Sequence, residues 1–244
     1  MTDSQTLFSL DQATIAWSGR VVLRDISVHI RAGEKVALLG KSGAGKSTLL
    51  RHLFRQESKG VAFCPQQPGL VPGLSVYHNI FMGQLERHNV IYNTLNLFFP
   101  FKQSLRDVAS LAAQVGLADK LMAKAECLSG GQQQRVSLAR SFYQQQAIFL
   151  GDEPVSAVDE TQAEALLQQI MAQHETVVIA LHNTRHALHY CDRIIGLAEG
   201  RIALDAPSSQ LSAEALSEFY QASDNLASGP QTENPQYQHP AAGC

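Results

Sequence analysis

A glycine-rich run at residues 40–48 is the segment with the clearest capacity for chemistry. It consists of Gly40, Lys41, Ser42, Gly43, Ala44, Gly45, Lys46, Ser47 and Thr48, which matches the pattern G-x-x-x-x-G-K-[ST] of a phosphate-binding loop. The apolar residues 35–39 before it are typical of a buried strand, and residues 46–54 of a helix. This context predicts a nucleotide-binding loop rather than a flexible turn with a surface lysine.

Each residue type in this loop has a physical role. The glycines allow backbone N–H groups to turn inward toward an anion, and the helix N-terminus adds its positive dipole end. We expect Lys46 to reach the β- and γ-phosphates of the nucleotide and the Ser47 hydroxyl to ligate Mg²⁺. Thr48 is expected on the α-phosphate side.

Two adjacent carboxylates, Asp152 and Glu153, follow a second apolar run at residues 147–150. In isolation, such a pair usually caps a helix or lies in a solvated turn. The carboxyl ends of strands in an α/β sheet are where ligands bind, so both groups are expected beside the phosphates. Asp152 would hold Mg²⁺ and Glu153 would polarise the attacking water.

The elements that position these residues alternate along the chain. Residues 13–17 and 25–30 are expected to form short strands that flank a turn at Ser18 and Gly19. Further buried strands are predicted at residues 147–150, 176–181 and 193–197, and helices at residues 131–143, 160–173 and 184–190. Buried strands separated by helices indicate an α/β fold with a mostly parallel sheet covered on both faces.

A segment of different character interrupts this alternation. Residues 81–117 contain polar helical stretches, an aromatic cluster at 97–101 and a predicted helix at 104–115. We therefore expect an inserted helical lobe over about residues 81–145, within one domain of residues 1–222. The segment 223–244 contains three prolines and few residues that could form a core, so it is predicted to be a disordered tail.

The composition excludes several protein classes. The 244 residues include 19 Lys and Arg against 22 Asp and Glu, and the net charge of −3 argues against a protein that coats nucleic acid. No run of 18 apolar residues is present, and the N-terminus lacks the pattern of a signal peptide. The four cysteines show no CxxC spacing, so we expect free thiols in the cytoplasm.

A further motif precedes the acidic strand, Leu128-Ser129-Gly130-Gly131-Gln132. Alone, it is an ordinary loop in which Ser129 caps a helix. Together with the phosphate loop it resembles the nucleotide-binding subunits of ATP-binding cassette (ABC) transporters, over roughly residues 13–220. The resemblance implies ATP hydrolysis with ATP and Mg²⁺, and a head-to-tail dimer that holds two ATP molecules. In that dimer, Ser129 and Gly131 of one copy face the γ-phosphate bound by the other.

The resemblance implies roles at further positions. Trp17 stands where the family has an aromatic residue that stacks on adenine, although tryptophan is also often a core residue. Gln66 resembles the glutamine that touches Mg²⁺ and the attacking water, with Gln67 as the alternative assignment. Asp159 resembles a residue that faces its counterpart across the dimer, and it can also cap the helix that follows.

His182, at the end of the strand predicted over residues 176–181, matches the switch histidine that contacts the γ-phosphate in this family. The catalytic set implied by the resemblance is Lys46, Gln66, Glu153 and His182. His186 and His189 lie three residues apart on the next predicted helix, but the sequence offers no third ligand. A metal site is not expected there.

Softer features resemble the subfamily that imports phosphonates or related phosphorus oxyanions. They are residues 67–76, 115–120 and 193–197 and the aromatic segment before Pro100. The resemblance implies a peripheral subunit on the cytoplasmic face of the inner membrane, with a second copy of itself, a membrane permease and, indirectly, a substrate-binding protein as partners. Nucleic acid is not an expected partner. An importer of another small solute and a non-transport ABC ATPase are the alternatives.

One departure from the family is visible in the sequence. Only nineteen residues, 47–65, separate Lys46 from Gln66, where family members carry extra antiparallel strands. The expected fold is therefore a P-loop NTPase cassette of ABC type with a mostly parallel sheet, a trimmed antiparallel β lobe and an inserted helical lobe. The apolar residues 69–74 are the first candidate for permease contact. Residues 98–101 are the second, which core packing explains equally well.

Overall fold

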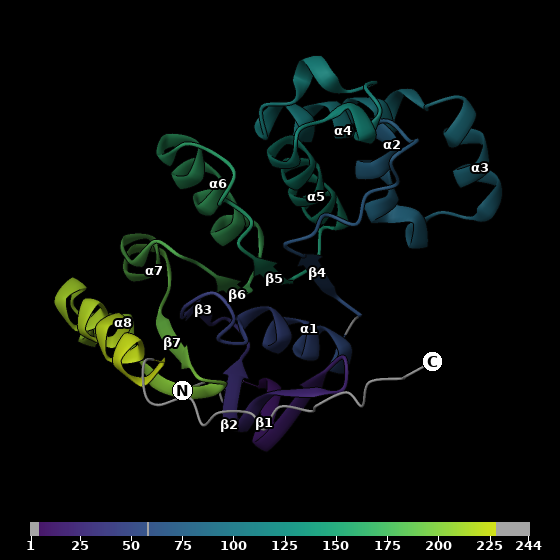
Figure 1. Cartoon of the computed structure of the whole chain (residues 1–244). Coiled ribbons are helices and arrows are strands. Elements are labelled where there is room, and N and C mark those ends of the chain that lie inside the picture. Colours follow the sequence, from purple (N-terminus) through teal and green to yellow (C-terminus); the bar gives the residue numbers. More distant parts are fainter. Residues whose placement is uncertain (1–4, 58, 228–244) are drawn as a thin grey trace, which may run out of the picture.

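The computed structural model of the chain describes residues 5–57 and 59–227, and a six-stranded sheet forms its centre (Figure 1). The strand order is β4-β5-β6-β3-β7-β8, in which the first five strands are parallel and β8 pairs antiparallel with β7. This confirms the predicted α/β fold with a mostly parallel sheet. The strands are β3 (Lys35–Leu39), β4 (Val61–Cys64), β5 (Ile148–Asp152), β6 (Thr176–Ala180), β7 (Arg193–Ala198) and β8 (Arg201–Pro207).

The two faces of the sheet belong to two separate hydrophobic clusters. Side chains alternate along a strand, so in β3 Val36 and Leu38 pack with α1 (Lys46–Gln56) and the N-terminal strands, while Ala37 and Leu39 pack on the opposite side. That opposite side is covered by α5 (Gly130–Gln144), α6 (Glu160–Gln173), α7 (Thr184–Tyr190) and α8 (Ala213–Ala227). Burial on both faces explains why these strands are continuously apolar.

The N-terminal strands form a separate two-stranded antiparallel sheet, β1 (Thr6–Trp17) and β2 (Arg20–Arg31). Both strands extend well beyond the predicted ranges 13–17 and 25–30. The turn at Ser18 and Gly19 has positive φ at both residues, as expected for a tight hairpin. α1 ends at Gln56 and β4 begins at Val61, and no other strand of the described residues joins this two-stranded sheet, which confirms the prediction of a trimmed β lobe.

The predicted helical lobe is also confirmed, although its first helix begins at Val76 rather than near residue 81. Its elements are α2 (Val76–Phe81), η1 (Met82–Arg87), α3 (Val90–Phe98), α4 (Lys102–Gln114), η2 (Ala118–Lys120) and η3 (Ala125–Cys127), followed by α5. None of the described helices is long and apolar enough to cross a membrane.

The C-terminal region differs from the sequence-based expectation. After β8, a short turn η4 (Ser208–Gln210) leads into α8, a helix that the sequence analysis does not predict. Because α8 continues to Ala227, the prediction of disorder is wrong for residues 223–227. Residues 228–244 of the predicted tail lie outside the described residues.

Candidate active site

The phosphate loop connects β3 to α1, and its glycines are required by geometry. Gly40, Gly43 and Gly45 have φ of +143°, +83° and +106°, which residues with a Cβ rarely adopt. A Cβ at Gly45 would overlap the Leu23 side chain, and one at Gly40 the Leu197 carbonyl oxygen. No side chain caps α1, so its first amides are open to an anion, as the sequence predicts.

Lys46 lies inside the curve of this loop and is only 5% exposed. Its Nζ donates to the Gly40 carbonyl at 2.6 Å and to the Lys41 carbonyl at 3.1 Å. Burial lowers the pKa of Lys46, and the nearby Glu153 and Asp152 carboxylates oppose that shift. The fold therefore brings Lys46 close to two carboxylates at the mouth of the loop.

Asp152 ends β5 and is fully buried. Neither carboxylate oxygen has a hydrogen-bond partner among the described residues. Burial raises the pKa of Asp152, and the Ser47 hydroxyl nearby opposes this rise. Unpaired buried oxygens next to a hydroxyl fit Mg²⁺, which binds oxygen ligands and retains several waters.

Glu153 is the point where three predicted residues meet. Its carboxylate lies 2.5 Å from His182 Nε2, and it accepts a hydrogen bond of 3.5 Å from Gln66 Nε2. The Glu153 side chain is 14% exposed, and its backbone has φ of +55°, an unusual value for a residue with a side chain. Backbone strain of this kind clusters at functional sites. Gln66 rather than Gln67 makes this contact.

Trp17 lies at the end of β1, beside α1. It is 36% exposed, so the core alternative raised from the sequence is wrong. The Arg51 and Arg55 guanidinium carbons lie 4.8 Å and 5.2 Å from the centre of its ring, within cation–π distance. The sequence analysis missed both arginines, although their spacing from Ser47 places all three residues on one face of α1.

Another residue that the sequence analysis missed is Tyr220 of α8. Its hydroxyl accepts a hydrogen bond of 3.3 Å from the Gly40 backbone N–H, and this contact ties the last helix to the phosphate loop. Burial raises the pKa of Tyr220, so its hydroxyl stays protonated. The two residues are far apart in the chain and no spacing rule connects them.

Ser129 and Gly131 lie at the exposed start of α5. Ser129 forms a capping box with Gln132, in which its N–H donates to Gln132 Oε1 at 3.0 Å and its Oγ accepts from the Gln132 N–H at 3.3 Å. Asp159 caps α6 by accepting from the Gln162 N–H at 3.0 Å. The hydrogen bonds of Ser129 and Asp159 are local, and Gly131 lies close to Ala157. Within the described part of the chain, none of these contacts reaches the phosphate loop.

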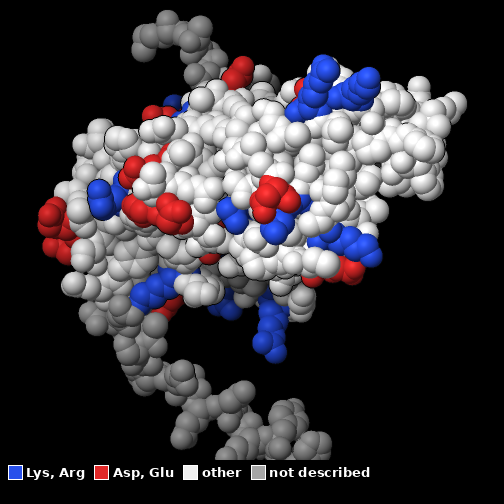
Figure 2. Space-filling model, turned by 90° about the horizontal axis from the view of Figure 1, so that it is seen from above, with Lys and Arg blue, Asp and Glu red and all other residues white. Residues whose placement is uncertain are grey.

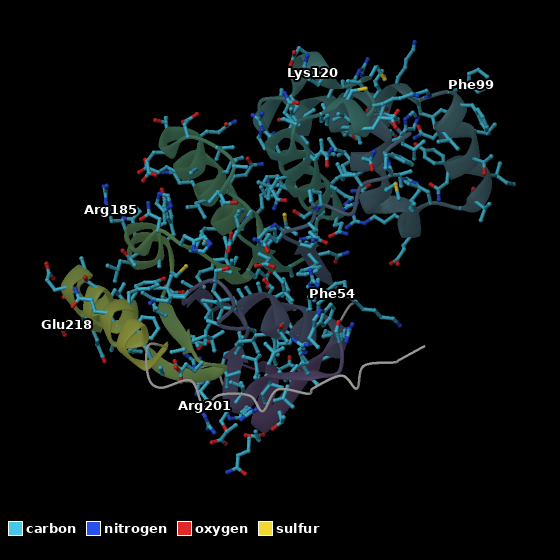
Figure 3. The ribbon with its side chains drawn as sticks, viewed as in Figure 1. Phe54, Phe99, Lys120, Arg185, Arg201 and Glu218 are labelled. Carbon is cyan, nitrogen blue, oxygen red and sulfur yellow. The ribbon has the colours of Figure 1, made fainter. Side chains whose placement is uncertain are left out.

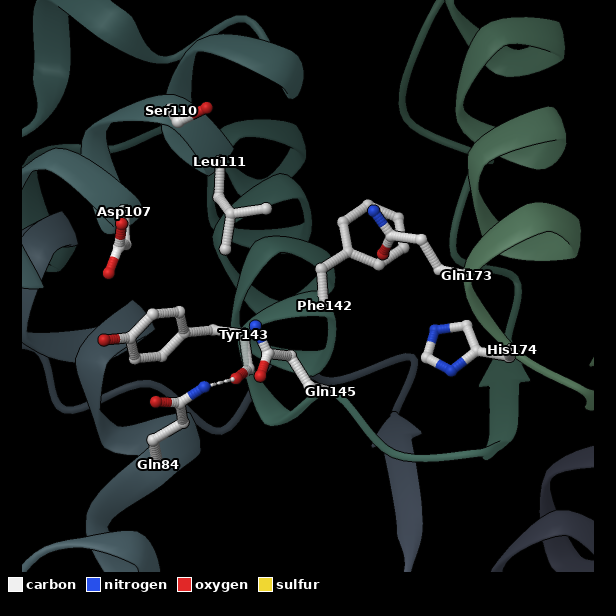
Figure 4. A pocket seen from close by; sticks show the side chains of 9 residues that line it. All are labelled: Gln84, Asp107, Ser110, Leu111, Phe142, Tyr143, Gln145, Gln173 and His174. Carbon is white, nitrogen blue, oxygen red and sulfur yellow. Dashed lines mark hydrogen bonds between the residues drawn. The ribbon is translucent and has the colours of Figure 1, made fainter.

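Two cavities of the structure differ in whether they border the predicted nucleotide-binding residues. A cavity of about 200 Å³ borders the phosphate loop between Lys41–Ala44 and the end of β7. A larger one, of about 630 Å³, lies between η1, α4, α5 and α6 and contains none of the predicted nucleotide residues (Figure 4). It is lined by Gln84, Asp107, Ser110, Leu111, Phe142, Tyr143, Gln145, Gln173 and His174.

Comparison with known proteins assigns this geometry to a family. A family model described as "ABC transporter" matches residues 23–60 and 54–156. A phosphite import ATP-binding protein, PxtA of Stutzerimonas stutzeri, is 37% identical over 86% of both chains. The chain belongs to the ABC transporter family. As an ABC cassette it binds and hydrolyses ATP.

Other relatives agree with this assignment. A phosphonates import ATP-binding protein, PhnC of Thiobacillus denitrificans, is 38% identical to this ABC chain. The match covers 84% of this chain and 88% of the relative. Among solved structures, the dimeric bacterial ABC transporter cassette MJ0796 superimposes with a TM-score of 0.70 at 23% identity. That match covers 82% of this chain and 98% of the other. At that identity, the likeness establishes the cassette fold.

The buried carboxylate of Asp152 leads to a stability prediction. Asp152→Asn should stabilise the nucleotide-free chain by about 1–2 kcal/mol, because an amide costs less to bury without partners than a carboxylate. In a chain of this size, that is a rise in Tm of about 2–8 °C at pH 7. Thermal unfolding, followed by circular dichroism, measures it.

The pH dependence of this difference follows from the raised pKa. The folded chain holds the Asp152 proton more tightly than the unfolded chain, so stability is lost as pH rises from the ordinary aspartate pKa through the raised value. The gap between the two proteins should therefore widen as pH rises above the ordinary aspartate pKa and close as pH falls below about 4. Asp119→Asn, at an exposed carboxylate, is the matched control with no expected change. A lower Tm for Asp152→Asn, or a gap independent of pH, would contradict the account.

Proposed function

We propose that this ABC ATPase is the peripheral, energy-coupling subunit of an importer for phosphite, phosphonates or a related phosphorus oxyanion. It would act on the cytoplasmic face of the inner membrane with a permease and a substrate-binding protein. The observation that carries the catalytic part is the meeting of Lys46, Asp152, Glu153, Gln66 and His182 at the phosphate loop. The printed names of the relatives support the substrate class.

The proposal gives each site residue a role that its position in the structure supports. Lys46 and the open amides of α1 bind the phosphates, and the exposed ring of Trp17 stacks on the adenine. Ser47, Asp152 and Gln66 would hold Mg²⁺, which would supply positive charge to neutralise the phosphates. Glu153 accepts the proton of the attacking water, and His182 and Gln66 hold its carboxylate in position. Phosphoryl transfer depends mostly on such positioning.

Two copies are needed for a complete site in this proposal. The open N-terminus of α5, with Ser129 and Gly131, would face the γ-phosphate bound by the partner subunit. Asp159 would meet its counterpart near the dimer axis while it continues to cap α6. Closure and opening of this dimer would move the permease between its two orientations.

An apolar groove on the helical lobe is the surface we propose for the permease. Its volume is about 360 Å³, and its lining residues are Leu74, His78, Phe81, Met82, Leu85, Val90, Asn93, Thr94 and Leu97. Phe98 and Phe99 beside it are 69% and 73% exposed, so core packing does not explain them, and Phe99 points outward in Figure 3. Figure 2 shows a broad surface without charged side chains at the end of the molecule where α3 lies.

The groove is mechanically connected to the active site. Asn79 holds the loop after Gln66 through hydrogen bonds to the backbone of Val71 and Leu74. Arg140 of α5 donates to the Pro68 carbonyl at 2.6 Å and to the Gly69 carbonyl at 3.1 Å. A displacement of the groove would thus reach both Gln66 and α5, which Ser129 caps.

Affinity purification of the tagged chain from gently solubilised native membranes tests this proposal. We expect a polytopic permease to co-purify, and Leu97→Asp and Phe99→Asp to reduce its recovery at least about tenfold, since each removes about 1.5–3 kcal/mol of apolar burial. Val21→Asp, at an exposed residue of the β lobe, should leave recovery unchanged. Recovery of soluble partners alone would favour a non-transport ABC ATPase. In the reconstituted complex, ATPase stimulation by phosphite or phosphonate supports the substrate class, and stimulation by another solute alone would contradict it.

A further inference from the structure

A second group of potential ligands lies away from the phosphate loop, between α6 and α7. Glu160 and Glu164 are one turn apart on the same face of α6, and His186 projects from α7. One carboxylate oxygen from each glutamate and one ring nitrogen of the histidine all lie within 4.8 Å of one another. Two helices that are separate in the sequence therefore bring three donor atoms to one point.

His186 supplies an independent sign that this cluster binds something. The residue is only 5% exposed, and its Nε2 makes no hydrogen bond of acceptable geometry within the described residues. Glu160 Oε1 nevertheless lies 3.0 Å away, so the ring nitrogen is close to a carboxylate without being directed at it as a hydrogen-bond donor. Buried polar side-chain atoms normally have partners, and this one faces a pair of oxygen ligands without a proper bond.

The donor set is that of a zinc ion. One imidazole nitrogen and two carboxylate oxygens are typical protein ligands of Zn²⁺, which then keeps a fourth position for water. Bonds of about 2.0–2.2 Å place tetrahedral ligand atoms roughly 3.3–3.6 Å apart. The two glutamates are exposed, so a small change of their side-chain torsions closes the present spacing. Arg185 borders the same cavity, but the two carboxylates outweigh its single charge.

We propose that Glu160, Glu164 and His186 form a zinc-binding site that fastens α6 to α7. α6 begins directly after Asp159, and His186 follows four residues after His182. Asn183, which caps α7, already donates to Glu160 Oε1 at 3.2 Å. Zinc at this site would thus restrain α6, which follows Asp159, and α7, which follows His182. The sequence analysis expected no metal at His186 and His189 because it found no third ligand, and the two glutamates that supply further donor atoms lie in a different helix.

Cobalt binding to the full chain tests the site, with Co²⁺ as a spectroscopic substitute for Zn²⁺. The background carries Cys127→Ser and Cys244→Ser, because Cys127 is exposed while Cys64 and Cys191 are buried. Excess Mg²⁺ and ATP keep the phosphate loop occupied. We expect one equivalent of Co²⁺ per chain with visible d–d absorption that one equivalent of Zn²⁺ abolishes.

Single substitutions assign the ligands. Glu164 is exposed, so Glu164→Gln should weaken Co²⁺ binding at least about tenfold without affecting the fold. His186→Gln should weaken Co²⁺ binding by a similar factor. His189→Gln is the matched control and should bind normally, because His189 borders the same cavity but is not one of the three clustered ligands. Three results would each overturn the proposal. They are the absence of the absorption band from the parent chain, an unchanged Co²⁺ affinity in Glu164→Gln, and a loss of Co²⁺ binding in His189→Gln.

Discussion

Glu153→Gln should lower kcat for ATP hydrolysis by about 10²–10⁴-fold while ATP binding is retained, because a positioned general base contributes that much. The amide has nearly the same shape as the carboxylate but accepts a proton far less readily. ATP is bound by Lys46 and the amides of α1, which this change leaves in place. Steady-state phosphate release and equilibrium binding of a fluorescent ATP analogue separate the two effects.

The environment of Glu153 explains why this one side chain has so large a role. Its carboxylate is held between His182 Nε2 at 2.5 Å and Gln66 Nε2 at 3.5 Å, so it is fixed rather than free to rotate. Glu126→Gln is the matched control, since that carboxylate is half-exposed in the helical lobe and pairs with Lys124. Turnover like that of the wild type in Glu153→Gln, or an equal loss in Glu126→Gln, would show that the base is a different group.

ATP should strengthen association of two copies by at least about 10²-fold. Each site in the dimer gains a charge-assisted hydrogen bond from the start of α5, worth about 1.5–3 kcal/mol, and there are two sites. Gly130→Glu should abolish this effect, because it puts a carboxylate where the γ-phosphate would lie. Gly130 is exposed with open space around its Cβ position, and an acidic residue in the first turn stabilises a helix. The isolated chain should therefore fold normally.

Much of the active site could be predicted because its parts are local. The phosphate loop needs glycines at fixed positions for backbone reasons, and the buried strands before and after it are short apolar runs. Asp152 and His182 lie just after such runs, so strand ends in a parallel sheet predict their convergence. To predict the contact of Glu153 with Gln66, one must also know that β4 pairs with β5.

The remaining features depend on packing between distant segments. α8 has no chemical motif, and its role through Tyr220 at Gly40 appears only when the helix is placed against the sheet. The sequence alone does not tell whether Phe98 and Phe99 are exposed or packed in the core, because an aromatic run is compatible with either location. The approach of Glu160 to His186 requires α6 and α7 to lie side by side, which no spacing within either helix reveals.

Sedimentation velocity of the full-length Glu153→Gln chain with Mg²⁺ and ATP tests most directly the claim that two copies enclose the nucleotide. The account predicts a species of twice the 26.6 kDa chain mass with ATP, and the single-chain mass without nucleotide. Adding Gly130→Glu to the same chain should leave the single-chain mass in both conditions. A single-chain mass at saturating ATP, or a dimer that forms equally well with Gly130→Glu, would contradict the shared site.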